Sequence, residues 1–552
     1  MNINKKVVFL SILSILYLIF NIIFFYSFPF FADGAIYCDL IRDNTPRNIF
    51  SFEYKNFPPL FFFISSVINK LIKNVSLTTI LTTTIPIILL VFTLFLELRR
   101  SFNENVAFWS AVALLLSPMF LWTISHRLMD PLSYFLMVLM IVSYLQTLRK
   151  RKISLLLIPA AFLLPMSKQT SLISLAIVIF HYFSYSIFKV VLNKKIKPDI
   201  SLITVPIIIV FFVGGMLLSH NSYKNLLNKV PFINLFLSQT KEIKAIDKLL
   251  TVDQQIIAEE INDRFIIKND TMPYFFPLLK KMKVRQALQY FYPLPISSKS
   301  NKHWFSPAKN YFDLINLFFL SFLVGLILIF REKNNLYGEI ILSTLIASVF
   351  FFPRYAIKRY VFIIPIVVSV FFGLFVNFIL NIDSSASIKT ARNYLFKTLF
   401  FLLLIQVFVS EISDISQYKN IPSRRSAPYL ISTLKEIRTE FPEIIGKTIF
   451  VPHSEPIYYL NADTVWDWRL FLVSEEEKIM NYLRSKNVSY LIIPAYSLSP
   501  YASDGLKQVE NTVQNLANSK VIPTGTVFYD MLIKEDYFPK LKEYGRFTLY
   551  RI

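Results

Sequence analysis

Acidic and basic side chains recur at the ends of the long apolar segments of this 552-residue chain. Orienting the segments by their flanking Lys and Arg residues puts one group of these charges on a single side of a membrane. The group consists of Asp33, Asp130, Lys168, Arg354, Lys358 and Arg359. Carboxylates can accept protons, and Lys and Arg can bind phosphate. Charges at membrane level are costly unless they pair or line a cavity, so the group indicates a functional site. The alternative, that each charge simply reaches interfacial water, explains single residues better than the group.

The composition requires most of the apolar surface to face lipid or other helices. Hydrophobic residues make up 54% of the chain, which has only 10 Gly. The net charge of +22 does not indicate a nucleic-acid surface, because many of the cations mark the ends of apolar segments. Cys38 is the single cysteine, so no intrachain disulfide can form. The sequence predicts a membrane protein that does not bind nucleic acid.

The apolar segments predict about eleven spans of a plasma (inner) membrane, with a cytoplasmic N-terminus. Lys5 and Lys6 precede the first segment, and Arg99-Arg100 follow the second. The predicted spans are Val7–Phe31, Leu77–Leu98, Val106–Ile124, Pro131–Leu148, Ile153–Met166, Thr170–Leu192, Ile200–Leu218, Phe312–Phe330, Ile340–Phe352, Val361–Leu380 and Tyr394–Ser410. An odd number of crossings places the C-terminus outside the cell.

Two domains follow from this pattern. Residues 1–410 form a transmembrane catalytic domain with external loops at 32–76 and 219–311. The apolar stretch Pro59–Leu71 within the first loop predicts an interfacial helix in the membrane plane. Residues 411–552 predict a soluble extracytoplasmic α/β domain, because β-rich runs at 447–451, 490–493 and 547–550 flank a capping box at Ser474–Glu477.

Four short stretches give the chain a family resemblance. They are Asp33-Gly-Ala-Ile-Tyr37, Asn56-Phe-Pro-Pro59, Leu128-Met-Asp-Pro131 and Pro165-Met-Ser-Lys168. In order and spacing they resemble motifs of the polyprenyl-phosphate-dependent glycosyltransferases of the GT-C fold, in the branch of protein mannosyltransferases and lipid A aminoarabinose transferases. The basic turn from Arg354 to Arg359, before a late span, resembles that family too. The chain departs from the family pattern at Gly34, at Asn56-Phe57 and at Gln169.

The resemblance implies a mainly α, polytopic membrane enzyme that transfers a sugar from a polyprenyl-phosphate donor. It implies that Asp33 is the base of an inverting transfer and that Asp130 assists it. Lys168, Arg354, Lys358 and Arg359 would bind the donor phosphate. We expect Tyr37, Tyr54 and His126 to position the acceptor or the sugar.

Other functions and ligands stay open from the residues. A divalent metal would have few ligands, because the five His residues form no ligand-spaced pair. A transporter or flippase for lipid-linked saccharides and an O-antigen polymerase or ligase are the alternatives. The charges lie at outer span ends and no internal repeat occurs, which favours the enzyme. The sequence does not identify the sugar, the prenyl carrier or the acceptor.

Overall fold

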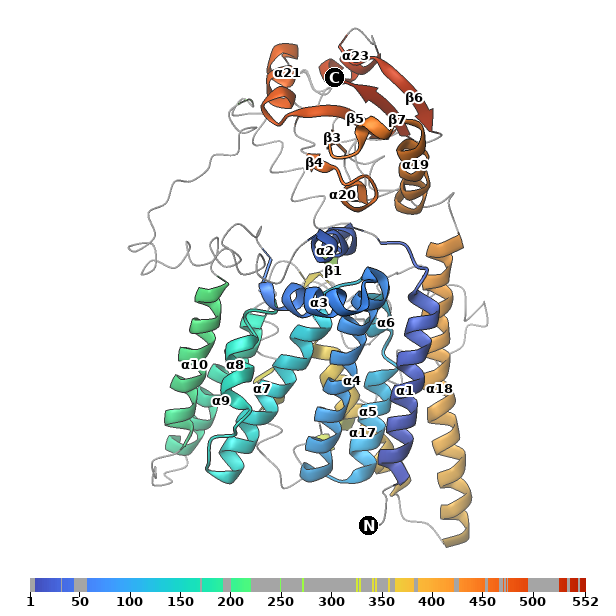
Figure 1. Cartoon of the computed structure of the whole chain (residues 1–552). Helices are drawn as coiled ribbons and strands as arrows, with labels where there is room; N and C mark the ends of the chain where they lie inside the picture. Colours follow the sequence, from blue (N-terminus) through green and yellow to red (C-terminus); the bar gives the residue numbers. More distant parts are fainter. Residues whose placement is uncertain are drawn as a thin grey trace, which may run out of the picture. The chain divides into compact units, whose positions relative to one another are not determined.

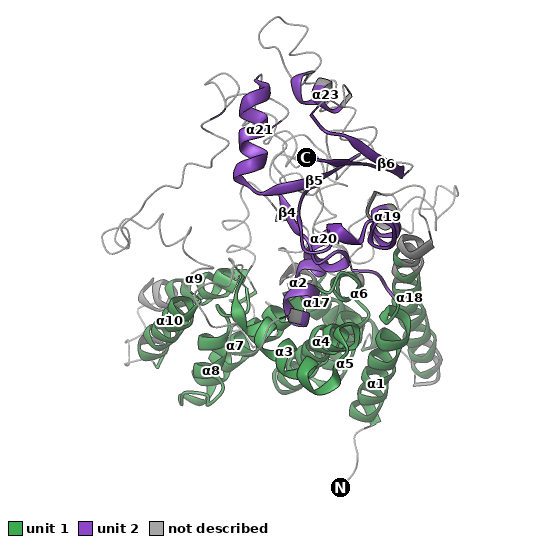
Figure 2. Ribbon diagram, turned by 45° about the horizontal axis from the view of Figure 1, so that its top comes forward, with its two compact units in different colours: residues 1–27, 44–229, 272–415 green, residues 28–43, 230–271, 416–552 purple. Residues whose placement is uncertain are grey.

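A computed structural model describes most of the chain. The described residues are 5–30, 32–43, 57–168, 171–191, 200–219, 363–381, 386–420, 426–451, 455–465, 475–494, 526–533, 537–544 and 547–552, with isolated positions elsewhere. The chain forms two compact units (Figure 2), each of which draws on separate parts of the sequence. Unit 1 contains residues 1–27, 44–229 and 272–415, and unit 2 contains residues 28–43, 230–271 and 416–552.

Unit 1 is built from helices (Figure 1). Its helices are α1 (Lys5–Phe25), α3 (Pro59–Ile72), α4 (Val75–Ser101), α5 (Glu104–Leu115), α6 (Pro118–Ser125), α7 (Asp130–Lys150), α8 (Leu157–Leu163), α9 (Leu172–Val191), α10 (Ser201–Leu218) and α17 (Ile363–Leu380), and α18 (Ala386–Asn420) follows them. Two-residue strands, β1 (Thr271–Met272) and β2 (Ala356–Ile357), occur between α10 and α17.

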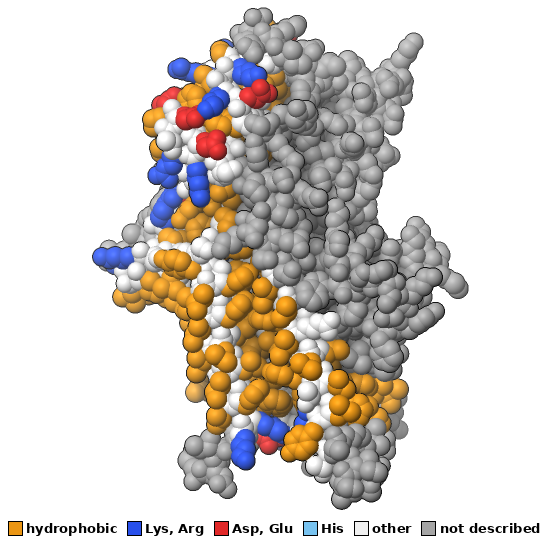
Figure 3. All heavy atoms as spheres, turned by 90° about the vertical axis from the view of Figure 1, so that its right-hand side faces the viewer, with side chains coloured by type: hydrophobic (Ala, Val, Ile, Leu, Met, Phe, Trp, Pro, Cys, Tyr) orange, Lys and Arg blue, Asp and Glu red, His pale blue; other side chains and the backbone are white. Residues whose placement is uncertain are grey.

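Among the described residues, four helical segments are long and apolar enough to cross a membrane. They are Lys5–Phe25, Val75–Ser101, Glu104–Ser125 and Asp130–Lys150. Exposed apolar side chains include Ile12 and Leu16 of α1 and Leu402 of α18. Figure 3 shows a broad hydrophobic surface on the face that it draws. The predicted class, a mainly helical membrane protein with a small C-terminal sheet, is confirmed.

Several predicted spans differ from the observed helices. The span Val106–Ile124 is divided into α5 and α6, because Ser117 takes an extended conformation before Pro118. In place of Ile153–Met166 the structure has only the seven-residue helix α8. Helix α18 continues ten residues beyond the predicted end at Ser410. The predicted spans Phe312–Phe330 and Ile340–Phe352 lie largely outside the described residues, so the number of spans stays a prediction.

Cations and one buried acid gather where α4 and α7 end. Glu97 of α4 is buried and pairs with Arg149 of α7, and it also accepts a hydrogen bond from Gln146 Nε2 at 3.1 Å. Lys6, in the first turn of α1, donates to Asn105 in the first turn of α5. The start of α1, the end of α4 and the end of α7 therefore lie at one end of the unit 1 helices.

Two glycines allow close helix packing. A Cβ atom added at Gly373 of α17 would lie 2.5 Å from the Val106 carbonyl oxygen and would also overlap Ser110, both on α5. A Cβ atom at Gly215 of α10 would overlap the Phe162 carbonyl oxygen and lie 2.7 Å from Pro165 Cγ. Residues larger than glycine would push these backbones apart.

The C-terminal part of unit 2 is a five-stranded sheet with helices. The strand order is β4 (Asp463–Val465), β3 (Thr448–Phe450), β5 (Val488–Pro494), β7 (Phe547–Arg551) and β6 (Lys540–Tyr544). Strand β3 pairs in parallel with β4 and β5, and β7 is antiparallel to β5 and β6. The helices are α19 (Ser426–Glu440), η7 (Pro442–Ile444), α20 (Glu455–Tyr459), α21 (Glu476–Ser485) and α23 (Thr526–Ile533).

Buried residues lie on both faces of this sheet. One cluster includes Phe450, Leu491 and Phe528, and a second includes Leu434, Ile449 and Ile492. Alternating residues of β3 and β5 therefore enter opposite cores, which is typical of a sheet covered on both sides. The predicted strands are confirmed. The predicted capping box is wrong, because Glu475 is the N-cap of α21 and makes no side-chain cap bond.

We predict that Gly215→Ala lowers the thermal unfolding midpoint of the purified protein in detergent. Overpacking costs about 1–3 kcal/mol, because α10 must move away from the α8 backbone. Gly214→Ala is the matched control, since its Cβ atom would lie 3.6 Å from the Phe162 ring, an ordinary contact. Equal midpoints for the two variants would contradict the packing argument.

Candidate functional site

Asp130 is the first residue of α7. The preceding residue, Met129, makes no side-chain cap bond, and Pro131 occupies the first helical turn. Proline fits there because its missing N–H would have no partner within the helix. A carboxylate in this first turn is stabilised by the positive end of the helix dipole. The Leu-Met-Asp-Pro sequence therefore starts the helix and places a negative charge at its N-terminus.

Asp130 forms a buried ion pair with Lys168. The two side chains are only 1% and 8% exposed, and Lys168 Nζ donates to Asp130 Oδ1. The Tyr134 hydroxyl, one turn later on α7, donates to the same oxygen at 3.1 Å. Burying two charges costs free energy that their attraction recovers only in a good geometry with further hydrogen bonds. The pair therefore ties the turn after α8 to the start of α7.

A backbone hydrogen bond brings a third motif to this pair. Leu60 N, directly after Pro58-Pro59, donates to the Met166 carbonyl oxygen at 3.0 Å. Pro59 opens α3, for which its fixed backbone is suited. Met166 lies two residues before Lys168. The Pro-Pro, Met-Ser-Lys and Asp-Pro stretches, which are far apart in the sequence, thus form one cluster in unit 1, here called the three-motif cluster.

His126 and Arg127 lie at the end of α6, shortly before Asp130. Arg127 has φ 55°, and its backbone N donates to the Ile124 carbonyl oxygen. Leu128 N donates to the Thr123 carbonyl oxygen at 3.0 Å. This is a Schellman motif, which usually has glycine at the position of Arg127. The His126 ring stacks on Trp122 with centroids 4.4 Å apart. His126, predicted from the sequence to position the acceptor or the sugar, lies in this cap.

Arg127 is a residue that the sequence analysis missed. Its side chain is fully buried, and Nη2 donates to the Phe25 carbonyl oxygen at the end of α1. A cation stabilises a helix C-terminus, where carbonyl groups lack partners within the helix. The signal in the sequence was a single Arg at the left-handed cap position. Glycine would adopt this backbone conformation at a lower conformational energy.

The remaining predicted residues are divided between unit 2 and the undescribed parts. Asp33 and Tyr37 lie on α2 (Ala32–Asp43), which belongs to unit 2. Asp33 is half-buried in the first turn, and Tyr37 is 3% exposed. Tyr54, Arg354, Lys358 and Arg359 lie outside the described residues. The segment 32–43, predicted as part of an external loop, is thus a helix.

The described residues do not fit a metal centre. No group of three His, Cys, Asp or Glu side chains that could hold a metal ion occurs among them. Asp130 already accepts hydrogen bonds from Lys168 and Tyr134. We therefore derive no chemical step through a metal.

We predict that Lys168→Met destabilises the protein more than Tyr134→Phe does. Removing one partner of a buried pair costs about 3–5 kcal/mol, whereas a neutral hydrogen bond contributes about 1 kcal/mol. Adding Asp130→Asn to Lys168→Met removes the isolated carboxylate and recovers most of the loss. The measurement is the unfolding midpoint in detergent, and a Lys168→Met midpoint equal to that of the native protein would contradict the buried pairing.

Residues 56–215, which contain the three-motif cluster, match the family model described as dolichyl-phosphate-mannose-protein mannosyltransferase. The sequence matches no curated protein sequence.

Solved structures match over most of the chain at low sequence identity. ArnT from Cupriavidus metallidurans in the apo state has a TM-score of 0.54 at 10% identity, covering 99% of this chain and 97% of that one. The oligosaccharyltransferase AglB from Archaeoglobus fulgidus, in complex with an inhibitory peptide and a dolichol-phosphate, has a TM-score of 0.51 at 11% identity, covering 88% and 69%. An ArnT structure bound to undecaprenyl phosphate has a TM-score of 0.53 at 10% identity, with coverage of 99% and 97%. The chain therefore has the fold of the GT-C glycosyltransferases.

Proposed function

We propose that this protein is a membrane glycosyltransferase that moves a sugar from a polyprenyl-phosphate donor to a protein, lipid or glycan acceptor. The three-motif cluster is the observation that carries the proposal. The Leu60–Met166 backbone hydrogen bond and the Lys168–Asp130 ion pair connect three of the four stretches that give the family resemblance. The similar structures of ArnT and AglB are complexes with undecaprenyl phosphate and with dolichol-phosphate, which supports a polyprenyl-phosphate carrier.

Breaking the bond between the phosphate and the anomeric carbon leaves a new negative charge that needs cations. Lys168 supplies one in this proposal. An ammonium group has three donors, so it can bind phosphate while Asp130 holds it in place. Arg354, Lys358 and Arg359 supply the others, and an Arg fork suits two phosphate oxygens.

The acceptor needs a base, and we assign that role to Asp33. Its carboxylate takes the acceptor proton while the acceptor attacks the anomeric carbon opposite the phosphate, which inverts the sugar. Tyr37 and Tyr54 position the acceptor. His126, whose ring stacks on Trp122, contributes to a flat surface suited to a sugar face.

We propose that the protein crosses the plasma (inner) membrane several times, with its N-terminus in the cytoplasm and its C-terminal domain outside. The gathering of charges at one end of unit 1 supports this orientation. Lys6 contacts the start of α5, and Arg149 contacts the end of α4, beside Arg99-Arg100. Clustered Lys and Arg mark the cytoplasmic end of membrane helices.

We predict that Asp33→Asn lowers sugar transfer by roughly 100- to 10,000-fold, because the amide cannot accept the proton. The assay offers the reconstituted protein a panel of labelled polyprenyl-phosphate hexoses and pentoses with membrane extract as acceptor. Asp463→Asn, an exposed carboxylate of unit 2, is the control and transfers at the native rate. Native transfer by Asp33→Asn with every active donor would show that the base is another group. A native protein that forms no new glycosidic bond and instead moves the lipid across vesicles would be a transporter.

The orientation predicts the labelling of two single-cysteine variants. In a Cys38→Ala background, Glu475→Cys reacts with an impermeant maleimide in intact spheroplasts, because it is exposed in the C-terminal domain. Lys150→Cys, at the exposed end of α7, reacts only after the membrane is permeabilised. The reverse pattern would invert the topology.

A further inference from the structure

The helix that carries Asp33 packs against the C-terminal domain. Within unit 2, α2 contacts the short helix α20. The buried residues of α2 include Ala35, Cys38 and Ile41, which recur at helical spacing and so lie on one face. The C-terminal half of unit 2 thus holds a segment that comes from near the start of the chain.

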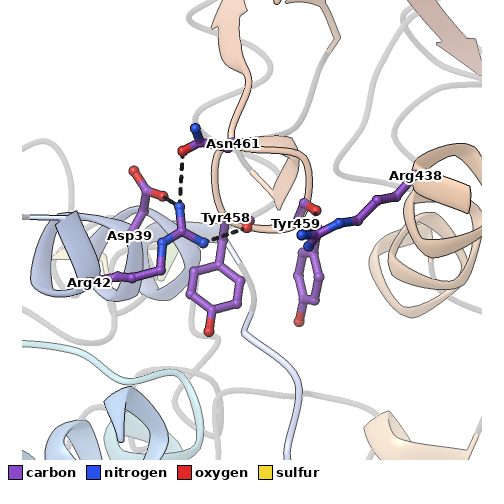
Figure 4. Close-up of polar contacts among 6 residues, drawn as sticks. All are labelled: Asp39, Arg42, Arg438, Tyr458, Tyr459 and Asn461. Atoms are coloured by element: carbon purple, nitrogen blue, oxygen red, sulfur yellow. Dashed lines mark hydrogen bonds and ion pairs between the residues drawn. The ribbon is translucent and has the colours of Figure 1, made fainter. Parts of the chain in front are cut away.

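Arg42, in the last turn of α2, makes polar contacts with residues at and just after the end of α20 (Figure 4). Nη1 donates to the Tyr458 carbonyl oxygen at 3.0 Å, and Nη2 donates to Asn461 Oδ1 at 3.1 Å. Nη2 also pairs with Asp39, one turn earlier on α2. The guanidinium lies over the Tyr458 ring at 5.0 Å, where a cation–π attraction adds to the hydrogen bonds. We call Arg42, Asp39, Tyr458 and Asn461 the α2 latch.

A second contact holds the chain on the other side of Asp33. Phe30 N donates to the Tyr459 hydroxyl at 3.0 Å, and the Phe30 ring meets the Tyr458 ring edge-on at 4.7 Å. Phe30 precedes Asp33 by three residues, and Arg42 follows it by nine. The segment with the carboxylate is therefore fastened at both ends to Tyr458 and Tyr459, two adjacent residues.

The acceptors of the latch are themselves fixed by the domain core. Leu460 and Ala462, which alternate with Asn461, are buried in the core that contains Leu434 and Ile449. Asn461 has φ 50°, a conformation that Asn tolerates better than most residues. From α19, Arg438 Nη1 donates to the Tyr459 carbonyl oxygen at 3.2 Å. A movement of α19 or of this core would therefore reach α2 through α20.

We propose that Arg42 is a positioning residue, through which the C-terminal domain sets the place of the Asp33 carboxylate and hence the turnover rate. The proposal rests on the proposed function, in which Asp33 is the base. Arg42 lies roughly 13 Å along the helix from Asp33 at 1.5 Å per residue, so it acts through α2 and not on the reacting atoms.

The experiment uses the full-length protein and its native Cys38. This thiol is fully buried on α2, so its rate of reaction with N-ethylmaleimide reports how often α2 leaves its site. Arg42→Gln and Asn461→Gly each remove contacts of the latch, and glycine keeps the backbone conformation of Asn461. We expect each variant to speed Cys38 labelling by roughly 10- to 100-fold, the equilibrium effect of losing charge-assisted hydrogen bonds. Lys478→Ala, which removes an exposed pair with Glu475, leaves labelling unchanged.

The same variants are assayed with the polyprenyl-phosphate sugar that the native protein turns over. We expect kcat to fall in the variants whose labelling rises, because a loosened α2 holds the carboxylate less precisely, with KM for the donor unchanged. Arg42→Lys, which keeps the charge without the fork, gives intermediate values. Labelling at the native rate in Arg42→Gln would overturn the latch. Faster labelling at native kcat would overturn the positioning role and leave the proposed function standing. A native protein without transfer activity would overturn the proposed function alone, since the labelling rates would still test the latch.

Discussion

The buried ion pair between Asp130 and Lys168 is the constraint on which the arrangement of unit 1 depends. It joins the N-terminus of α7 to the turn after α8, and the Leu60–Met166 hydrogen bond adds the start of α3. In a surrounding of low dielectric constant, a buried charge is stable only beside its partner. Separating the two turns would leave the Asp130 carboxylate and the Lys168 ammonium buried and unpaired, at a large cost in desolvation free energy. The helix dipole of α7 adds to this by favouring an acid at its first residue.

Helix α7 is held by charge at its other end too. Arg149, in the last turn of α7, pairs with the buried Glu97 of α4. The helix dipole favours a cation such as Arg149 at this C-terminal end. The helix has 21 residues, about the length that crosses 30 Å of hydrocarbon. Charge pairs at both ends therefore hold α7 against α4 and against the turn after α8.

Sequence patterns predicted some of these features well and others poorly, for identifiable reasons. Apolar length and flanking cations located α1, α4 and α7, because a bilayer imposes a length that few other constraints mimic. The division of α5 from α6 at Ser117-Pro118 was missed, although Pro118 was a local signal for it. The pairing of Asp130 with Lys168 was not predicted, since the two residues are 38 positions apart and were assigned to separate motifs with separate roles. The docking of Arg42 on Tyr458 joins residues 416 positions apart, and no periodicity reports such a contact.

The glycine at position 373 fixes the position of α17 along α5. Because its missing side chain lets α17 rest directly on the α5 backbone, sliding either helix along the other would meet Ser110 or the Val106 carbonyl. Helix α17 begins at Ile363, about 15 Å from this contact along the axis, and Arg359 lies four residues earlier in the chain. A single absent methyl group in the helix interior thereby fixes where α17 starts relative to α5, and a bulkier residue there would displace the whole helix.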